Sequence, residues 1–403
     1  MRPVVENSAT IRSSGTNLTR AKSHNFSVIL EVVRTQGPIS RAAIASITSL
    51  SRQTVQNIVC ELEEAKLVRL TPGVIRGRGH PGMDISLNPE GAVSIGMHVD
   101  RQRLTAVACD LDGKIIWTDN RPFRGGDVAA ANQTVLGVLA AFRGDPVMGA
   151  IRLLGACIAA PGPFGRGMHE VVDTASFREL GDEANVAMLT ESAGIPIVIE
   201  NDATAAAVGE WLYGVGKGAT NLAVLHIGRG LGAGFILGGA PFRGRTKSAG
   251  EIGHLVVKRD GLLCTCGNKG CLERYLSVNA LSEHLGLVSD DPESLGQIAA
   301  LCQSHDSRVT GWVKDVAEHF RRAINVIETM LDPDTIVVGG LVPDALLDEL
   351  IGAANPLYEQ IAPPSAGFPR VQRGSSGPLT VALGAAAVAT DAHFAPSISR
   401  LVL

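Results

Sequence analysis

The sequence predicts a helical N-terminal unit followed by an α/β body in which one plan occurs twice. Three segments within residues 25–68 place apolar residues at helical spacing. After residue 92 the chain changes to short apolar strands that alternate with helices. A strand–turn–strand pattern at 93–117 returns at 221–239. Such an internal repeat predicts a duplicated fold.

The composition is that of a globular protein. The chain has 403 residues, of which 45% are hydrophobic and 19% charged, enough for two or three domains. No apolar run reaches the roughly 18 residues of a membrane span, and the start lacks a signal-peptide pattern. We therefore expect a cytoplasmic protein without a membrane partner. The cysteines at positions 60, 109, 157 and 302 are scattered, which indicates reduced thiols.

The net charge of −4 is divided unevenly along the chain. Residues 1–87 hold 11 lysines and arginines against 6 acidic residues, so the remainder is acidic. A basic head on an acidic body suggests that the head meets a polyanion.

The N-terminal unit is expected to begin with a flexible tail over 1–22, followed by three helices. The first helix is predicted from Asn25 and ends at Gly37-Pro38. Ser40 and Ser51 precede the next two apolar-periodic segments and are predicted N-caps.

Polar side chains gather at the start of the third helix. Two helices joined by a short turn, with a polar start to the second, form the helix-turn-helix plan, and such side chains can contact bases and phosphates. An alternating hairpin follows around 71–73, and its glycine/arginine strip can approach a minor groove closely. The predicted DNA contacts are Ser51, Arg52, Gln53, Thr54, Gln56, Asn57, Arg76 and Arg78. The alternative for the three helices is a small protein-interaction bundle.

The α/β body is read in two halves. In the first half we expect a strand and hairpin over 94–117, helices at 128–142 and 182–193, and strands at 153–164 and 196–200. In the second half we expect a hairpin over 221–239, helices within 275–330, a buried strand at 335–343, and a last strand and helix over 377–390.

One histidine and three cysteines lie close together in the sequence between 250 and 274. Thiolates and an imidazole are ligands that zinc prefers, and four protein ligands indicate a structural ion. Gly267 and Gly270 would let the chain turn tightly around it. The predicted ligands are His254, Cys264, Cys266 and Cys271. The alternative is three buried free cysteines and an unrelated histidine.

The motif E-I-G-H followed by C-x-C-G-x-x-G-C-L-E resembles the signature of the ROK family, which contains sugar kinases and sugar-responsive repressors. The resemblance extends from about residue 24 to the end. It implies a winged helix-turn-helix at 23–90 and then a duplicated actin/hexokinase-like α/β fold with a zinc loop. The first half would cover 91–208 and be joined by a C-terminal helix at about 384–403, and the second would cover 209–383.

The resemblance also implies a sugar site. The positions that match it are Asn201, Asp202, Glu251, His254 and Glu273. In a kinase, Asp202 would be the general base. From the residues alone, Asn201 or Asp202 could instead serve only as a helix N-cap.

The nucleotide side departs from the kinases of the family. They carry an acid and a Gly-Gly-Thr turn in the first hairpin, where this chain has His98 and Asp100-Arg101-Gln102. The second hairpin has Gly228-Arg229-Gly230 instead of Gly-Thr-Gly. The stretch 174–183 also lacks the Asn-Leu pair of sugar kinases. We therefore expect ATP binding to be lost and the sugar site to act as a sensor.

The predicted function is that of a sugar-responsive DNA-binding transcriptional regulator, a repressor of carbohydrate-use genes. Its partners would be operator DNA, a sugar effector and further copies of the chain in a homodimer or homotetramer. The alternatives are an active ATP-dependent sugar kinase with a DNA-binding head, and a regulator controlled by a protein partner in place of a sugar.

Overall fold

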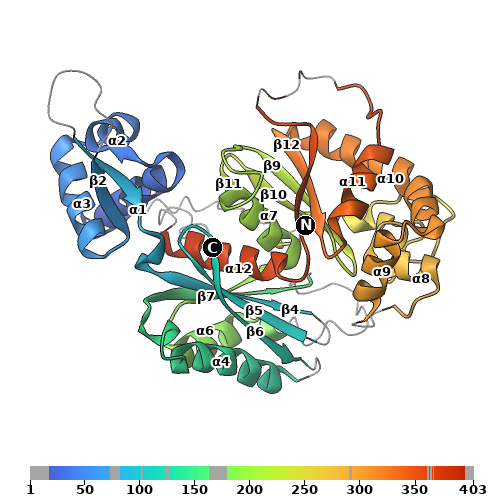
Figure 1. Cartoon of the computed structure of the whole chain (residues 1–403), viewed down its shortest axis with the longest axis horizontal. Helices are drawn as coiled ribbons and strands as arrows, with labels where there is room; N and C mark the ends of the chain where they lie inside the picture. The colour runs from blue at the N-terminus through green and yellow to red at the C-terminus, as the bar shows by residue number, and fades with distance from the viewer. Residues whose placement is uncertain are drawn as a thin grey trace, which may run out of the picture. The chain divides into compact units, whose positions relative to one another are not determined.

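In the computed structural model the chain divides into two units, Met1–Asn88 with Phe394–Leu403, and Pro89–His393 (Figure 1). The structure describes residues 18–72, 82–100, 103–123, 127–162, 179–289, 293–360, 363, 365 and 367–394. Among these residues no helix is both long and apolar enough to cross a membrane.

The smaller unit packs three helices with a three-stranded antiparallel sheet of order β1-β3-β2. This is the arrangement of a winged helix-turn-helix, as predicted. Its elements are α1 (Leu18–Gln36), β1 (Ile39–Ser40), α2 (Arg41–Thr48), α3 (Arg52–Glu64), β2 (Val68–Pro72) and β3 (Met83–Leu87). Residues 73–81, which include the predicted DNA contacts Arg76 and Arg78, lie outside the described residues.

Both predicted serine caps of the smaller unit are confirmed. The Ser40 side chain accepts a hydrogen bond from the Ala43 amide, and the Ser51 side chain accepts one from the Thr54 amide. The start of α1 was predicted too late, because the helix begins at Leu18 and not near Asn25. Residues 18–24 lack an apolar stripe but include good helix formers. Lys22 also forms an ion pair with Glu61 of α3 at 2.9 Å.

The larger unit contains two five-stranded sheets with the same connectivity. The first has the order β6-β5-β4-β7-β8 and the second β11-β10-β9-β12-β13. In each sheet, the first three strands of that half form an antiparallel meander, and the fourth and fifth strands join in parallel. This identity of order confirms the internal repeat that the sequence predicts.

The first half comprises η1 (Pro89–Gly91), β4 (Val93–Val99), β5 (Arg103–Asp110), β6 (Ile115–Pro122), α4 (Val128–Gly144), η2 (Met148–Ala150), β7 (Leu153–Ala160), α6 (Glu183–Ala193), β8 (Ile197–Asn201) and α7 (Asp202–Leu212). The second half comprises β9 (Leu222–Ile227), β10 (Leu231–Leu237), β11 (Ala240–Pro241), η3 (Ile252–His254), η4 (Leu272–Arg274), α8 (Val278–Leu285), α9 (Ser294–Gln303), α10 (Ser307–Leu331), β12 (Thr335–Gly340), α11 (Asp344–Ala353), β13 (Val371–Ser376) and α12 (Thr380–Phe394).

The helix that follows the last strand of each half packs on the sheet of the other half. Helix α7 lies on β9 and β10, and α12 lies on β4, where a side chain at Gly96 would overlap the α12 backbone. The two helices also meet each other, because a side chain at Gly384 would overlap the Ala205 carbonyl. Small residues at these crossings let the backbones approach closely.

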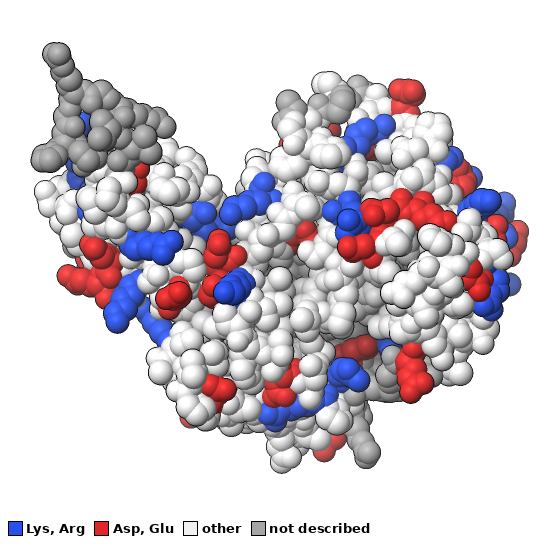
Figure 2. Space-filling model, viewed as in Figure 1, with Lys and Arg blue, Asp and Glu red and all other residues white. Residues whose placement is uncertain are grey.

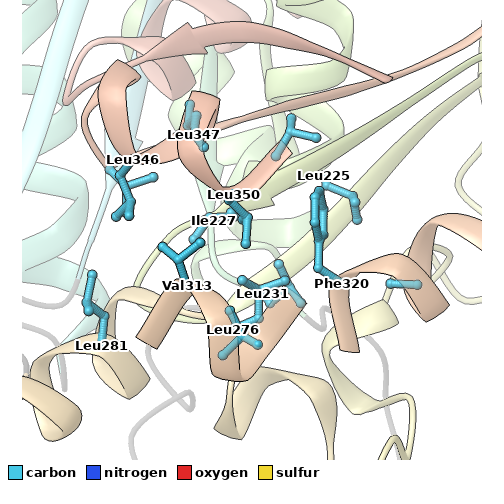
Figure 3. Packing of buried hydrophobic residues seen from close by; sticks show 14 of the residues in the cluster. Leu225, Ile227, Leu231, Leu276, Leu281, Val313, Phe320, Leu346, Leu347 and Leu350 are labelled. Atoms are coloured by element: carbon cyan, nitrogen blue, oxygen red, sulfur yellow. The ribbon is translucent and has the colours of Figure 1, made fainter. Parts of the chain in front are cut away.

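The largest core cluster covers one face of the second sheet. Strands β9, β10 and β12 contribute residues such as Leu225, Ile227 and Leu231, and α10 and α11 cover them with Val313, Phe320 and leucines of α11 (Figure 3). This core fixes the carboxyl ends of β9 and β12, which border the site described below.

The last predicted strand was misplaced. The fifth strand of the second sheet is β13 at Val371–Ser376, and the segment from Thr380 is entirely helical. The apolar run after residue 378 fits a strand and a buried helix equally well. Strand β13 is polar, and among the described strands its partner is β12.

Candidate functional site

The four predicted metal ligands come together. The ligand atoms of His254, Cys264, Cys266 and Cys271 all lie within 4.8 Å of one another. The His254 Nδ1 lies 3.6 Å from the Cys264 Sγ, and the Sγ atoms of Cys266 and Cys271 are also 3.6 Å apart. Sulfurs around a tetrahedral ion at about 2.3 Å would be about 3.8 Å apart. The group could therefore hold a metal ion.

Two glycines shape the loop that carries these side chains. Gly267 and Gly270 have φ angles of 90° and 75°, in the region that favours glycine. The backbone closes through isolated bridges between Val256 and Cys271 and between Leu263 and Lys269. All seven cysteines of the chain are free of disulfides, as expected.

The five side chains predicted to bind a sugar line a single cavity of about 240 Å³. Asn201 and Asp202 come from the junction of β8 and α7 in the first half. Glu251 and His254 come from around η3, and Glu273 comes from η4, in the second half. Residues up to 72 positions apart in the sequence, Asn201 and Glu273, thus face one space between the two halves of the larger unit.

Asn201 is the N-cap of α7 and lines the cavity as well. Its Oδ1 accepts hydrogen bonds from the amides of Ala203 and Thr204 at 3.0 and 3.2 Å. The Asp202 Oδ1 accepts a bond from the Ala203 amide at 2.7 Å. Burial, together with the nearby charges of Glu251 and Asp100, raises the pKa of Asp202 to about 7.

His254 connects the metal group to the cavity. Its Nδ1 faces the thiols, whereas its Nε2 lies 3.9 Å from a carboxylate oxygen of Glu251. Burial raises the pKa of Glu251, His254 opposes that shift, and Glu273 adds to it. The Glu273 Oε2 accepts a hydrogen bond from the Leu231 amide at 3.1 Å, which ties η4 to β10.

An ion pair joins the first hairpin turns of the two halves. Arg229, in the turn after β9, donates from Nε to the Asp100 Oδ2 at 3.1 Å, and Asp100 follows β4 in the other half. Both side chains line the cavity. Arg101 and Gln102 lie outside the described residues.

Two histidines that were not predicted from the sequence to belong to this site also line the cavity. His98 in β4 and His226 in β9 occupy matching places in the repeated hairpins, and both are buried. Burial lowers both pKa values, that of His226 to about 3 with a further contribution from His98. The signal was present in the sequence, since H-V-D-R-Q in the first hairpin returns as H-I-G-R-G in the second.

A second ion pair, also missed from the sequence, joins the halves beside the site. The Arg243 Nε donates to the Glu200 Oε2 at 2.7 Å, and Glu200 directly precedes Asn201. The Glu200 Oε1 accepts a bond from the Asn201 amide at 3.0 Å. The pair therefore positions the end of β8.

In the smaller unit, the start of α3 presents polar side chains away from its core. Arg52, Gln53, Gln56 and Asn57 are exposed, whereas Val55, Ile58 and Val59 are buried. The Gln53 amide donates to the Asn57 side chain at 2.8 Å, and Thr54 bonds with the Ser51 hydroxyl. The helix thus separates a polar face from an apolar one, as predicted.

Comparison with characterised proteins finds similarity to transcriptional regulators. The chain is 28% identical over 269 residues to the xylose repressor of Bacillus subtilis strain 168, covering 66% of this chain and 69% of that protein. It is 24% identical over 341 residues to the DNA-binding transcriptional dual regulator NagC of Escherichia coli K12, covering 82% of this chain and 83% of that protein.

Solved structures share the fold. A ROK family transcriptional regulator described as a homolog of the E. coli MLC protein superposes with a TM-score of 0.73 at 22% identity, over 94% of this chain and 98% of that one. A ROK family glucokinase from Streptomyces griseus, in complex with glucose and AMPPNP, superposes with a TM-score of 0.59 at 25% identity, over 74% of this chain and all of that one.

The repeated sheet order, the loop with one histidine and three cysteines, and the cavity between the halves thus occur together in one unit. The sequence pattern of the ROK family matches residues 102–392, which include the first sheet apart from β4, the whole second sheet, the cysteine loop and nearly all of α12. The chain belongs to the ROK family.

Proposed function

We propose that this protein is a sugar-responsive, DNA-binding transcriptional regulator that represses carbohydrate-use genes. The observation that carries the proposal is that one chain contains a winged helix-turn-helix and a cavity lined by carboxylates, an amide and an imidazole, groups that can bind sugar hydroxyls. The names of the similar repressors support it.

DNA would be bound through the exposed start of α3. Arg52, Gln53, Gln56 and Asn57 offer donors and acceptors that suit base edges and phosphates in a major groove. Ser51 and Thr54 sit at the helix N-terminus, a favourable place for a phosphate contact. We propose that Arg76 and Arg78 add contacts from the wing, and that a homodimer or homotetramer reads a palindromic site.

The metal would be a structural zinc ion. His254, Cys264, Cys266 and Cys271 fit zinc because a set of one imidazole and three thiolates is closed and tetrahedral. The ion would supply no chemistry beyond cross-linking the loop. By fixing His254, the loop places the imidazole Nε2 and the neighbouring Glu251 toward the cavity.

Sugar would act by bridging the two halves. Asn201 and Asp202 belong to the first half, and Glu251, His254 and Glu273 belong to the second. Carboxylates, an amide and an imidazole can each take up sugar hydroxyls. A ligand that contacts both halves favours the state in which they are close, and this differential affinity is what an effector needs to shift DNA binding.

The alternative is an active sugar kinase. A pKa of about 7 suits Asp202 for general-base work, and a glucokinase shares the fold. Against it stands the Arg229–Asp100 ion pair, which lies between the two hairpin turns and adds a carboxylate where phosphates would approach. We therefore propose that Asp202 serves in ligand binding and not in catalysis.

The test is a thermal-shift screen of the zinc-loaded full-length chain against monosaccharides, with ATP–Mg²⁺ as a separate arm. A ligand that binds only the folded state increases the free energy of unfolding by about 2.7 kcal/mol at a hundredfold excess over Kd. The Tm therefore rises. We expect a sugar to raise the Tm and ATP–Mg²⁺ to leave it unchanged. A sugar that raises the Tm should then change the affinity for DNA from the protein's own promoter, measured by fluorescence anisotropy.

Each other outcome contradicts a stated part of the proposal. A clear ATP–Mg²⁺ shift with sugar-dependent ATP turnover would establish the kinase alternative. A sugar that binds without changing the affinity for DNA would leave a sugar-binding protein without regulation.

A further inference from the structure

The ligand cavity of the larger unit carries an excess of negative charge. Among the described residues, four acidic side chains line it, those of Asp100, Asp202, Glu251 and Glu273. Asp202 is only partly ionised at pH 7, because its pKa is about 7, and Asp100 is paired with an arginine, so the excess rests mainly on Glu251 and Glu273. Two cationic side chains stand among its described lining residues, and both are paired with acids. Arg229 bonds to Asp100, and Arg274 donates to both oxygens of Glu283 at 3.2 and 3.0 Å.

This imbalance belongs to the cavity and not to the visible surface of the unit. On the face shown in Figure 2, acidic and basic side chains of the larger unit are interspersed. Within the part of the chain that the structure describes, Asp202, Glu251 and Glu273 have contacts with backbone amides and His254, and none of the three forms an ion pair with a lysine or arginine. An anion entering this space would meet carboxylates at short range in a medium of low dielectric constant.

The two buried histidines that line the cavity do not add positive charge to it. His98 and His226 are buried, and burial lowers both pKa values, so both imidazoles are neutral at pH 7. A neutral imidazole has one donor and one acceptor and suits a hydroxyl. The buried Nδ1 of His226 has no hydrogen-bond partner among the described residues.

The backbone offers little to an anion either. Helix α7 points its N-terminus at the cavity, and free amides at such an end attract phosphates. Here the amides of Ala203 and Thr204 already donate to Asn201 and Asp202. A zinc ion with three thiolates, as proposed above, would add net negative charge as well.

From this charge distribution we propose that the cavity discriminates against phosphorylated and carboxylated ligands, and that the effector is a sugar without an anionic group. The inference rests on the proposed sugar-binding function and specifies its ligand class. Asp100 is then a specificity-determining residue, because it pairs with Arg229, the basic side chain that would otherwise attract a phosphate. His98 and His226 would form hydrogen bonds with sugar hydroxyls in the same cavity.

The experiment compares matched sugars by isothermal titration calorimetry with the full-length, zinc-loaded chain. The pairs are glucose with glucose 6-phosphate, N-acetylglucosamine with its 6-phosphate, and xylose with xylose 5-phosphate. Glucuronate serves as the carboxylated arm. For a neutral sugar that binds, we expect its phosphate ester to bind about tenfold or more weakly. The repulsion between the phosphate and the cavity carboxylates is the cause, and a tenfold change in Kd requires only a small difference in electrostatic free energy.

Two variants with opposite expectations separate charge effects from misfolding. Asp100→Asn removes a negative charge and should reduce the discrimination by roughly tenfold, whereas Arg229→Ala removes a positive charge and should increase it. A folding defect would weaken both members of a sugar pair together. Asp119→Asn is the matched control, because Asp119 is paired with Arg121 at 2.8 Å on β6 and does not line the cavity.

The outcomes distinguish this inference from the function on which it rests. Tighter binding of a phosphorylated or carboxylated sugar would overturn the inference and leave a sugar-responsive regulator. An unchanged discrimination in Asp100→Asn would remove Asp100 from the explanation. Binding of none of these compounds would overturn the sugar-responsive function and the inference with it.

Discussion

Asp202 shows how burial of a carboxyl group lowers the stability of the folded protein. Its side chain lies at the N-terminus of α7 in a cavity with Glu251, and burial raises its pKa to about 7. The folded protein therefore holds a proton there more tightly than the unfolded chain, in which an aspartate has a pKa of about 4. Stability should fall as the pH rises from about 4 through 7, because ionisation in the cavity is unfavourable.

We accordingly expect Asp202→Asn to stabilise the ligand-free protein at high pH. At pH 8.5 the variant should melt about 2–5 °C above the wild type, a value discounted for the partial exposure of the side chain. At pH 6 the two should differ less. Scanning calorimetry of the larger unit's transition at the two pH values would measure this.

Asp202→Glu is the control for this prediction because it keeps a titrating carboxyl at the position. It should retain a pH dependence like that of the wild type. If Asp202→Asn lost as much stability between pH 6 and 8.5 as the wild type, the carboxyl of Asp202 would not be the titrating group.

Individual residues also mark the limit of what the sequence could predict. Arg229 and Asp100 stand at equivalent turns of the two hairpins, so their opposite charges could be read from the repeat. Their contact across the cleft could not, since it depends on how the two sheets face each other. The Arg243–Glu200 pair joins residues 43 positions apart and had no motif to indicate it.

At the scale of elements, the cysteine loop was predictable because its chemistry is local. The ligand spacing and the two turn glycines all lie within 25 residues, and the structure brings the four ligand atoms together as predicted. The loop has little regular structure, being held by two isolated bridges and the short helices η3 and η4. A bound ion would therefore supply much of its order.

Removal of the metal should loosen this loop and lower the Tm by about 5 °C or more. We expect about one zinc ion per chain by elemental analysis, and its loss in Cys266→Ser or after treatment with a strong chelator. Cys60→Ser is the matched control, because Cys60 lies on α3 in the smaller unit and belongs to no metal group. A chain that is free of metal and melts like the wild type would show that the loop does not depend on an ion.

Strand β13 shows where element prediction failed. Its residues V-Q-R-G-S-S carry no apolar run, and the strand exists because β12 offers it a parallel partner at the sheet edge. Such pairing is a tertiary effect that overrides local propensity. Helix α11 was also not predicted, although its sequence D-A-L-L-D-E-L-I consists largely of good helix formers and its leucines cover the second sheet.

At the scale of the whole larger unit, the duplication was predictable and its interlocking was not. Two hairpins of the same kind were visible in the sequence, whereas the exchange of α7 and α12 between the sheets appears only in the fold. The contact at Gly384 leaves no space for a side chain, because a Cβ there would overlap the backbone of α7.

Gly384→Ala should therefore destabilise the larger unit by about 1–3 kcal/mol, the usual cost of overpacking a tight contact. Gly311→Ala is the matched control, since Gly311 also lies inside a helix but has nothing within 4 Å of the added Cβ. It should stabilise the protein by about 0.5–1 kcal/mol. Calorimetry of both variants would check the signs, and equal effects would contradict the tight crossing.

The position of α12 also bears on the order in which the protein is made. The last strand of the first sheet ends at Asn201, but the helix that covers β4 is formed by Thr380–Phe394. Thr390 of this helix donates a hydrogen bond to the Ser94 hydroxyl of β4. On the ribosome, the strands of the first half therefore emerge long before the helix that covers one of their faces. A chain truncated before Thr380 would contain the three helices and the sheet of the smaller unit, joined to a first sheet without the helix that covers β4.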